Sequence, residues 1–329
     1  MTSGGKPLLE VNQLITSFET ERGLLRAVDQ VSFSVHQGKT LGIVGESGCG
    51  KSVTAMSVTR LLPQPAGKIL GGHVWFKGRD LIRASDKEIR KVRGGEIGTI
   101  FQEPMSALNP VHRIGKQVSE VFRIHKKMSR KDAWDAATEM LDLVRIPAPE
   151  KRMMDFPHQL SGGMRQRIVI ALALACRPDL LIADEPTTAL DVTVQAQILD
   201  LISQLQSEMN MAVVLITHDL GVIAENCDEV VVMYAGRVVE RASTRELFAH
   251  PLHAYTRGLL ASIPTLETPS KAPLTTIPGM VAGLGDHSHG CRFCQRMGRG
   301  TSRTSRERPA FAEVSPDHWV ETCPECYQP

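Results

Sequence analysis

The stretch Gly45-Glu46-Ser47-Gly48-Cys49-Gly50-Lys51-Ser52 decides the fold of this 329-residue chain. The apolar run before it, residues 40–44, predicts a buried strand, and residues 53–62 after it predict a helix. A glycine loop in this context turns backbone N–H groups inward, and the helix N-terminus adds a positive dipole end. We therefore interpret Gly45 to Val53 as a phosphate-binding loop rather than a glycine-rich turn with a chance Lys-Ser pair. Lys51 would reach the β- and γ-phosphates of a nucleotide, and the Ser52 hydroxyl would bind Mg²⁺.

The composition indicates a soluble protein with a sizeable core and no strong charge bias. Hydrophobic residues make up 42% of the chain, and 38 basic against 36 acidic residues give a net charge of +2. That balance, together with an aromatic content of 5%, argues against nucleic-acid binding. No apolar run reaches the roughly 20 residues that span a bilayer, and the N-terminus lacks the layout of a signal peptide. We expect a cytoplasmic chain that contacts a membrane only through a partner.

Two carboxylates follow a further apolar run. Residues 180–183 predict a buried strand, and Asp184 and Glu185 come at its end. Asp184 suits a Mg²⁺ position beside Ser52, because this cation prefers oxygen ligands. Glu185 points differently and can polarise a water molecule for attack on the γ-phosphate. A buried structural ion pair is the alternative interpretation, and the complete order of motifs along the chain argues against it.

A glutamine and a histidine also follow predicted strands. Gln102 comes after residues 97–101 and can offer its amide oxygen to Mg²⁺ or to the attacking water. His218 comes after residues 212–216 and can reach the γ-phosphate. Alone, Gln102 would be a loop residue and His218 would carry no role, so both predictions depend on the order of the motifs. Phe18, just before a polar turn, is predicted to stack on the adenine, with an ordinary core position as the alternative.

A second glycine motif, Ser161-Gly162-Gly163, precedes residues 168–176, which predict a helix. Its backbone N–H groups at a helix N-terminus form a second anion site. One triphosphate does not need two such sites in the same chain. We therefore expect these residues to close over a nucleotide that another copy or a partner holds.

Taken together and in this order, the motifs resemble those of an ATP-binding cassette (ABC) ATPase over residues 8–262. A simple phosphate-loop kinase or GTPase has no segment like the Leu-Ser-Gly-Gly-Met sequence at residues 160–164. More narrowly, the chain resembles the ATPase subunits of oligopeptide and dipeptide importers. The segments that carry this narrower resemblance are residues 45–48, 101–110, 157–167, 183–191, 233–236 and 251–256.

The resemblance implies an α/β fold with four parts. These are an ABC-type ATPase core sheet, a small antiparallel β subdomain, an inserted helical subdomain and a Cys-rich C-terminal extension. The expected boundaries are 1–264 for the ATPase domain, with its insertion near 103–165, and 265–329 for the extension. The resemblance also implies a head-to-tail dimer. In it, one subunit contacts the ATP on the other subunit's phosphate loop through four residues, Ser161, Gly162, Gly163 and Asp191.

The function implied by the resemblance is an ATP-binding and ATP-hydrolysing subunit that energises the import of di- and oligopeptides. ATP and Mg²⁺ are its cofactors, and Glu185 and His218 mark its own site as competent for hydrolysis. The expected partners are a second, different ABC ATPase, two integral-membrane permease subunits and an extracytoplasmic substrate-binding protein, with no nucleic acid. The chain would be a peripheral protein on the cytoplasmic face of the inner membrane. The alternatives are import of nickel, glutathione or another small solute, and a soluble ABC ATPase that acts on nucleic acid or ribosomes.

The C-terminal region contains two Cys-x-x-Cys pairs, Cys291 with Cys294 and Cys323 with Cys326. Four thiolates predict a site for Zn²⁺ or an iron–sulfur cluster, although the pairs stand further apart than the roughly 15–20 residues usual for zinc. Free thiols are the alternative. Related importers often have a Cys-rich tail, and some bind a 4Fe-4S cluster, but Met297 stands where their second cysteine is expected. The residues leave the choice between Zn²⁺ and a 4Fe-4S cluster open.

The other cysteines, Cys49, Cys176 and Cys227, are scattered along the chain, as reduced intracellular thiols are. Cys49 lies inside the phosphate loop, where the resembling subfamily often has serine. A thiol exposed at that position would make the activity sensitive to alkylating reagents.

Overall fold

The structure, a computed structural model, describes residues 5–21, 23–102, 107–188, 190–263, 276–281, 283, 285, 287, 289–299, 304 and 306–328. The first residues of the expected C-terminal extension, 265–275, and of the expected insertion, 103–106, lie outside the described residues. The chain divides into two compact units. The helical unit comprises residues 1–8, 35–39 and 83–216, and the phosphate-loop unit comprises residues 9–34, 40–82 and 217–329.

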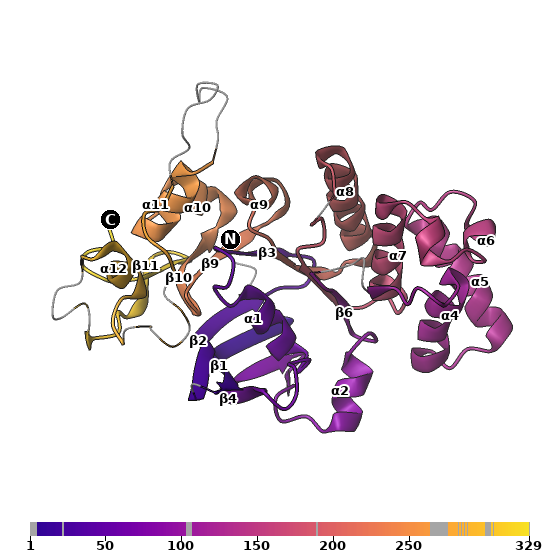
Figure 1. Ribbon diagram of the computed structural model, residues 1–329, viewed down its shortest axis with the longest axis horizontal. Coiled ribbons are helices and arrows are strands. Elements are labelled where there is room, and N and C mark those ends of the chain that lie inside the picture. The colour runs from indigo at the N-terminus through magenta and orange to yellow at the C-terminus, as the bar shows by residue number, and fades with distance from the viewer. Residues whose placement is uncertain are drawn as a thin grey trace. The chain divides into compact units, whose positions relative to one another are not determined.

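The phosphate-loop unit contains two groups of paired strands (Figure 1). In the first group, ordered β2-β1-β4-β5, β4 pairs antiparallel with both of its neighbours. Its strands are β1 (Leu9–Thr20), β2 (Gly23–Val35), β4 (Gly67–Phe76) and β5 (Arg79–Asp80). The second group follows the order β11-β12-β10-β9-β3, and only β3 and β9 in this group are parallel. Its strands are β3 (Thr40–Val44), β9 (Glu229–Tyr234), β10 (Arg237–Ser243), β11 (Phe311–Ser315) and β12 (His318–Glu321).

Short helices complete this unit, and the first of them follows the phosphate loop directly. The helices are α1 (Lys51–Val58), α9 (Leu220–Asn226), α10 (Thr244–Ala249), α11 (Ala254–Ala261) and α12 (Arg292–Met297). Helix α1 packs on β1, where the Thr16 and Ser57 hydroxyls form a buried hydrogen bond of 2.8 Å. The predicted helix at 53–62 therefore begins earlier and ends earlier than expected. It ends because the chain leaves the helical region, with Arg60 at φ 55°.

The helical unit is built on three parallel strands in the order β8-β7-β6 within its described residues. The strands are β6 (Ile97–Ile100), β7 (Leu180–Asp184) and β8 (Ala212–Ile216). Its helices are α2 (Asp86–Val92), α4 (Ile114–His125), α5 (Arg130–Leu143), α6 (Pro149–Arg152), η1 (Pro157–Gln159), α7 (Gly162–Leu174) and α8 (Val192–Met209). Helices α4, α5, α6 and α7 pack together as a group (Figure 1).

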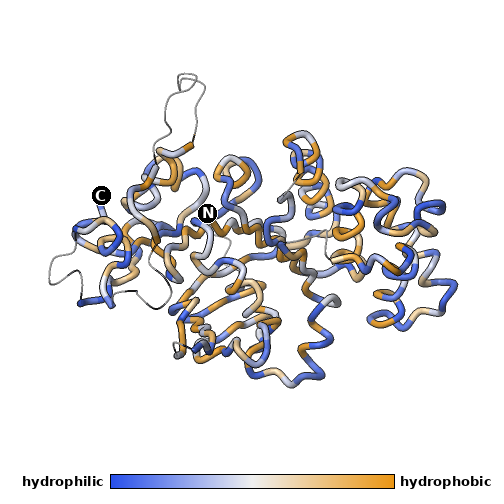
Figure 2. Tube along the Cα trace, in the orientation of Figure 1, coloured by the Kyte–Doolittle hydropathy of each residue, from blue (hydrophilic) through white to orange (hydrophobic). Residues whose placement is uncertain are grey.

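Hydrophobic strands form the core of each unit. Every residue of β3, β7 and β8 is buried, whereas α2 is mainly hydrophilic (Figure 2). Fully buried parallel strands read as continuous apolar runs, which explains why these three were evident in the sequence. The alternating residues 31–35 continue the same strand, β2, that begins at Gly23. No helix in the described part of the chain has the length and apolarity needed to cross a membrane.

Candidate nucleotide-binding site and four-cysteine centre

The phosphate loop follows β3 and requires glycine at two tightly packed positions. Gly45 has φ 152°, and a Cβ atom there would lie 2.2 Å from the Met233 carbonyl oxygen. Gly50, in the left-handed region at φ 104°, would place a Cβ 2.7 Å from the Ala27 carbonyl oxygen. Any side chain at either position would collide with backbone, so the path of the loop depends on glycine.

Lys51 follows the glycine loop, and its side chain reaches back to the first residues of that loop. Its Nζ donates hydrogen bonds to the carbonyl oxygens of Gly45, at 2.7 Å, and Glu46, at 3.0 Å. Ser47 and Gly48 are exposed at the tip of the loop, while Ser52 and Val53 are half-buried in the first turn of α1. An ammonium group and a helix N-terminus thus lie together beside exposed backbone, which is the arrangement that binds phosphate.

Cys49 is fully buried within this loop. Its relative exposure is 0%, and burial raises the pKa of its thiol. A protonated, inaccessible thiol is a poor nucleophile. The exposure that alkylation of Cys49 requires is therefore absent.

Two more predicted site residues belong to the same unit as the loop. Phe18 lies half-buried near the end of β1, paired in register with Gly67. His218 is exposed, in the turn before α9. That turn is anchored to the strand that leads into the loop, because the Thr217 N–H donates to the Ile43 carbonyl oxygen at 3.3 Å.

The helical unit places Gln102 beside Glu185. Asp184 is the buried last residue of β7, and the next residue, Glu185, has a left-handed backbone at φ 48°. Such a conformation is strained for a residue with a side chain, and the Glu185 N–H is held by the Ile216 carbonyl oxygen at 2.9 Å. One Glu185 carboxylate oxygen accepts hydrogen bonds from the Thr188 hydroxyl at 3.0 Å and from the Gln102 amide at 3.5 Å.

The same unit brings the second glycine motif close to Asp191. Ser161 caps α7 by accepting the Met164 N–H, and Gly162 and Gly163 form its first turn. A Cβ on Gly163 would lie 3.1 Å from Val194, in the first turn of α8, whose N-cap is Asp191. Ser161 and Asp191 are both exposed. A helix N-terminus with an exposed hydroxyl and a nearby carboxylate thus faces solvent.

The predicted site residues are divided between the two units. The phosphate-loop unit contains Phe18, residues 45–53 and His218. The helical unit contains Gln102, Ser161, Gly162, Gly163, Asp184, Glu185 and Asp191.

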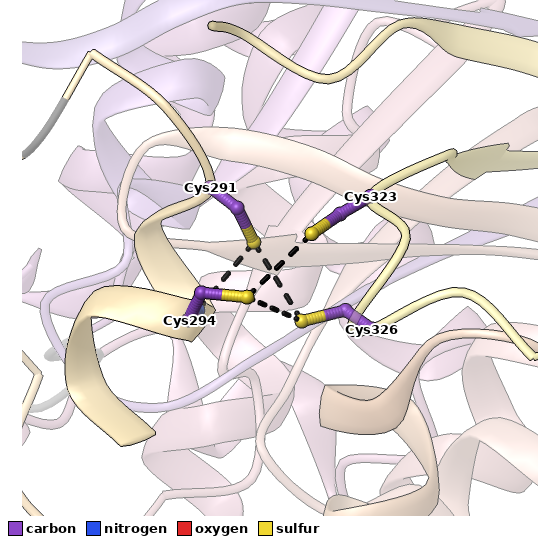
Figure 3. A group of neighbouring side chains, drawn as sticks. All are labelled: Cys291, Cys294, Cys323 and Cys326. Atoms are coloured by element: carbon purple, nitrogen blue, oxygen red, sulfur yellow. Dashed lines mark hydrogen bonds between the residues drawn. The ribbon is translucent and has the colours of Figure 1, made fainter. Parts of the chain in front are cut away.

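The four cysteines of the C-terminal region come together in one buried group (Figure 3). Cys291 and Cys294 lie at the start of α12, and Cys323 and Cys326 follow β12. The Sγ–Sγ distances are 3.2 Å for Cys294–Cys326, 3.5 Å for Cys294–Cys323 and 3.7 Å for Cys291–Cys326. All four sulfur atoms lie within 4.8 Å of one another, and each residue is at most 3% exposed.

A buried histidine faces this group. His253 is completely buried, and burial lowers its pKa to about 4, so the ring is neutral at pH 7. Its Nδ1 accepts the Tyr255 N–H at 3.1 Å, which leaves the ring proton on Nε2. That atom is buried without a hydrogen-bond partner among the described residues, and a ring nitrogen of His253 lies within 4.8 Å of the Cys291 sulfur. A thiolate at Cys291 would give this N–H an acceptor.

The structure also reveals contacts to the phosphate loop that the sequence did not predict. The Glu46 carboxylate accepts two hydrogen bonds from Arg296, and the Glu46 N–H donates to the Tyr255 hydroxyl at 2.9 Å. Behind the loop, the buried Asp29 carboxylate binds Arg237 and Arg292. Burial alone would raise the pKa of Asp29, but the two guanidinium groups lower it to about 2. Glu46, as an acidic residue inside the glycine motif, was the one sequence signal that indicated a cationic partner.

Comparisons with known proteins define the class. The family model described as "ABC transporter" matches residues 28–188, and "Oligopeptide/dipeptide transporter, C-terminal region" matches residues 239–301. A dimeric ATP-binding cassette solved in a post-hydrolysis state with ADP and Pi has a TM-score of 0.64 and 27% identity, covering 72% of this chain and 99% of its own. With the phosphate loop described above, these matches define an ABC ATPase, and the predicted cassette fold is confirmed.

The curated relatives narrow the class. A probable peptide ABC transporter ATP-binding protein of Sinorhizobium fredii is 52% identical over 94% of this chain and 93% of its own length. The oligopeptide transport ATP-binding protein OppD of Bacillus subtilis is 50% identical over 96% of this chain and 88% of its own. The chain belongs to the family of ATP-binding subunits of oligopeptide and dipeptide ABC transporters.

Proposed function

We propose that this chain hydrolyses ATP to energise the import of di- and oligopeptides through a membrane ABC transporter. The observation that carries the proposal is the phosphate loop, with Lys51 and the N-terminus of α1 at its base, in a chain about half identical to peptide-transport subunits. Import of nickel, glutathione or another solute is the alternative function, and a substrate test would distinguish it from peptide import.

We propose the following roles for the site residues. Lys51 and the amides of residues 45–53 hold the phosphates, and Phe18 stacks on the adenine. Ser52, Gln102 and Asp184 hold Mg²⁺, whose charge offsets that of the phosphates. Glu185 orients the attacking water and His218 contacts the γ-phosphate. The Gln102–Glu185 hydrogen bond supports this assignment, because it joins a magnesium ligand to the residue that acts on water.

We predict that Glu185→Gln abolishes turnover while ATP binding is retained. The substitution keeps the shape of the side chain and removes only the charge that polarises water. Steady-state phosphate release and equilibrium binding of a fluorescent ATP analogue are the two measurements. Glu208→Gln, an exposed-helix change on α8 of the same chemistry, is the matched control. Near-normal turnover in Glu185→Gln would refute its role.

The proposed assembly is a head-to-tail ATPase dimer with two permease subunits. Ser161, Gly162, Gly163 and Asp191 would contact ATP on the partner ATPase, which we expect to be a different polypeptide. The exposed Ser161 at the N-terminus of α7 supports this, since a helix N-terminus attracts anions. An extracytoplasmic binding protein would deliver the substrate.

The permease contact is proposed for the helical insertion. Large apolar side chains are exposed in the insertion and just before it: Phe101, Val111, Ile124, Met128 and Met154. A cavity of about 430 Å³ also opens between α4 and α5, lined by Phe122, Met140 and Cys176 among others. We propose that these side chains contact the permease. Through it the chain would lie on the cytoplasmic face of the inner membrane.

A pull-down tests the assembly and the substrate class together. Glu185→Gln, which should trap ATP, serves as bait in gently solubilised membranes, and copurifying proteins are identified by mass spectrometry. Two integral-membrane subunits and a second ABC ATPase are expected, and the associated binding protein then identifies the substrate. Recovery of soluble proteins or nucleic acid alone would overturn the transport assignment.

We further propose that the four cysteines bind a single tetrahedral metal ion, Zn²⁺ in preference to a 4Fe-4S cluster. Zn–S bonds of about 2.3 Å place neighbouring sulfurs of a tetrahedron about 3.8 Å apart. The observed separations of 3.2–3.7 Å fit that size. A four-iron cluster puts a separate iron behind each thiolate and therefore needs more widely spaced sulfurs. Bound zinc would act as a structural crosslink between α12 and the segment after β12.

Metal analysis tests this proposal. The protein is purified both with and without oxygen, and zinc, iron and acid-labile sulfide are quantified. One zinc per chain under both conditions is expected. Iron with sulfide in the anaerobic sample would identify the cluster instead, and no stoichiometric metal in either would refute a metal site.

A further inference from the structure

Three residues of the segment Cys291–Met297, here called the cysteine knuckle, make contacts at or behind the phosphate loop. Arg292 donates to the Ala235 carbonyl oxygen and to Asp29. The ring of Phe293 packs at 5.5 Å from the ring of Tyr255, whose hydroxyl accepts the Glu46 N–H. Arg296 completes the set with its bonds to the Glu46 carboxylate.

The Arg296–Glu46 ion pair has a specific bidentate geometry. The two Arg296 terminal nitrogens bind the two Glu46 oxygens at 2.5 and 3.2 Å, which is a bidentate arrangement. The guanidinium also donates to the carbonyl oxygens of Ile277, Pro278 and Gly279 at 2.8–3.1 Å. The Arg296 side chain is 4% exposed, whereas Glu46 remains 30% exposed. Arg296 is thus fixed in place, and Glu46 lies on the side of the loop open to solvent.

Glu46 poses an electrostatic problem at this position. It follows Gly45 directly, so its charge lies within the motif that receives a polyanionic nucleotide. A negative charge a few ångströms from a triphosphate opposes binding, and the opposition grows with the ligand's charge. A cation paired with the Glu46 carboxylate offsets most of this repulsion.

We propose that Arg296 is a positioning residue for ATP binding: it neutralises Glu46 and orients it away from the phosphates. This inference rests on the proposed ATP site and adds a role for the tail that does not involve hydrolysis. The pair joins positions 250 residues apart, so the C-terminal region completes the electrostatics of the loop.

The experiment is an equilibrium titration of the purified full chain with MANT-ATP and MANT-ADP. Arg296→Ala is expected to weaken MANT-ATP binding about tenfold, and MANT-ADP binding less, because ADP carries less charge. Arg296→Lys should lose less than the alanine variant, since it keeps the charge but not the two-pronged contact. Arg299→Ala removes an exposed arginine just after the same helix and should bind like the wild type.

A double-mutant cycle separates neutralisation of Glu46 from a general structural role. In a Glu46→Gln background there is no charge to neutralise, so adding Arg296→Ala should change MANT-ATP affinity less than about twofold. An equal loss in both backgrounds, or for both nucleotides, would overturn the proposal, as would wild-type affinity in Arg296→Ala. If Arg296→Ala does not fold, the lysine variant and the double variant answer the same question. Failure of the wild-type chain to bind MANT-ATP would instead refute the nucleotide site.

Discussion

The cysteine knuckle is joined to the phosphate loop in two places that differ in their access to water. In front, Arg296 binds Glu46, which is 30% exposed and lies within the glycine motif. Behind, Arg292 binds Asp29, which is 2% exposed, and the Asp29 N–H donates to Gly236, whose own N–H donates to the Cys49 carbonyl oxygen. The same short segment therefore forms one ion pair that a nucleotide can sense and one that it cannot. The front pair should therefore govern nucleotide affinity, and the back pair should govern the stability of the fold.

The largest effect is expected from Asp29→Asn, which tests the back pair. Removing the carboxylate charge leaves the buried Arg237 and Arg292 without their anion, and breaking a buried pair costs about 3–5 kcal/mol. Urea unfolding monitored by circular dichroism is the measurement. Glu19→Gln, at an exposed pair with Lys68, is the control and should leave the midpoint nearly unchanged. A midpoint equal to the wild type in Asp29→Asn would remove the distinction between the two pairs.

The next effect is expected from Cys323→Ser, which acts on both pairs at once. Loss of one thiolate should release the knuckle, so that MANT-ATP affinity falls about tenfold, as in Arg296→Ala, and the C-terminal region becomes sensitive to protease. Cys227→Ser, a thiol of the same unit outside the group, is the control. Normal affinity together with a cleaved tail would show that Arg296 holds Glu46 without the cysteine group.

The stability that the back pair contributes should depend on pH. The folded-state pKa of Asp29 is lowered to about 2, below its ordinary value of about 3.9, so its contribution is complete above pH 4. That stability is lost as pH falls from about 4 towards 2. Unfolding midpoints between pH 5 and pH 2 should therefore fall more steeply for the wild type than for Asp29→Asn. Parallel curves would contradict the assignment.

The smallest effect is expected at Cys49, which lies between the two pairs. Because its thiol is buried and its pKa is raised, iodoacetamide should not modify it in the folded protein, and ATPase activity should persist. Peptide mass spectrometry after timed labelling gives the extent of modification, with urea-unfolded protein as the positive control. Rapid labelling of Cys49 in the native chain would show that the loop opens.

The sequence predicted most accurately what is local. Residues 40–44 and 180–184 are continuous apolar runs, and both are buried strands whose ends lead into the glycine loop and into Glu185. The four cysteines were also grouped correctly, since two Cys-x-x-Cys pairs in one region have few other uses. The end of α1 was misplaced because its final turn has no strong signal, such as a glycine or proline stop.

What could not be predicted depends on pairs far apart in the chain. Nothing near Arg296 indicates that its partner is Glu46. Asp29 likewise gives no sign that three arginines beyond residue 230 will surround it, namely Arg237, Arg292 and Arg308. Charged residues are common, and only the fold selects which of them meet. The division of the predicted site residues between two units is likewise a property of three-dimensional packing and not of motif order.

The bonds from Lys51 to the Gly45 and Glu46 carbonyl oxygens have one more consequence. They join the last part of the glycine motif to its first part, so the hydrogen bonds of the lysine close the loop into a ring. A ring of this kind should resist local fluctuation before a phosphate arrives. Nucleotide capture should therefore cost little conformational entropy and proceed as a rapid single-step association.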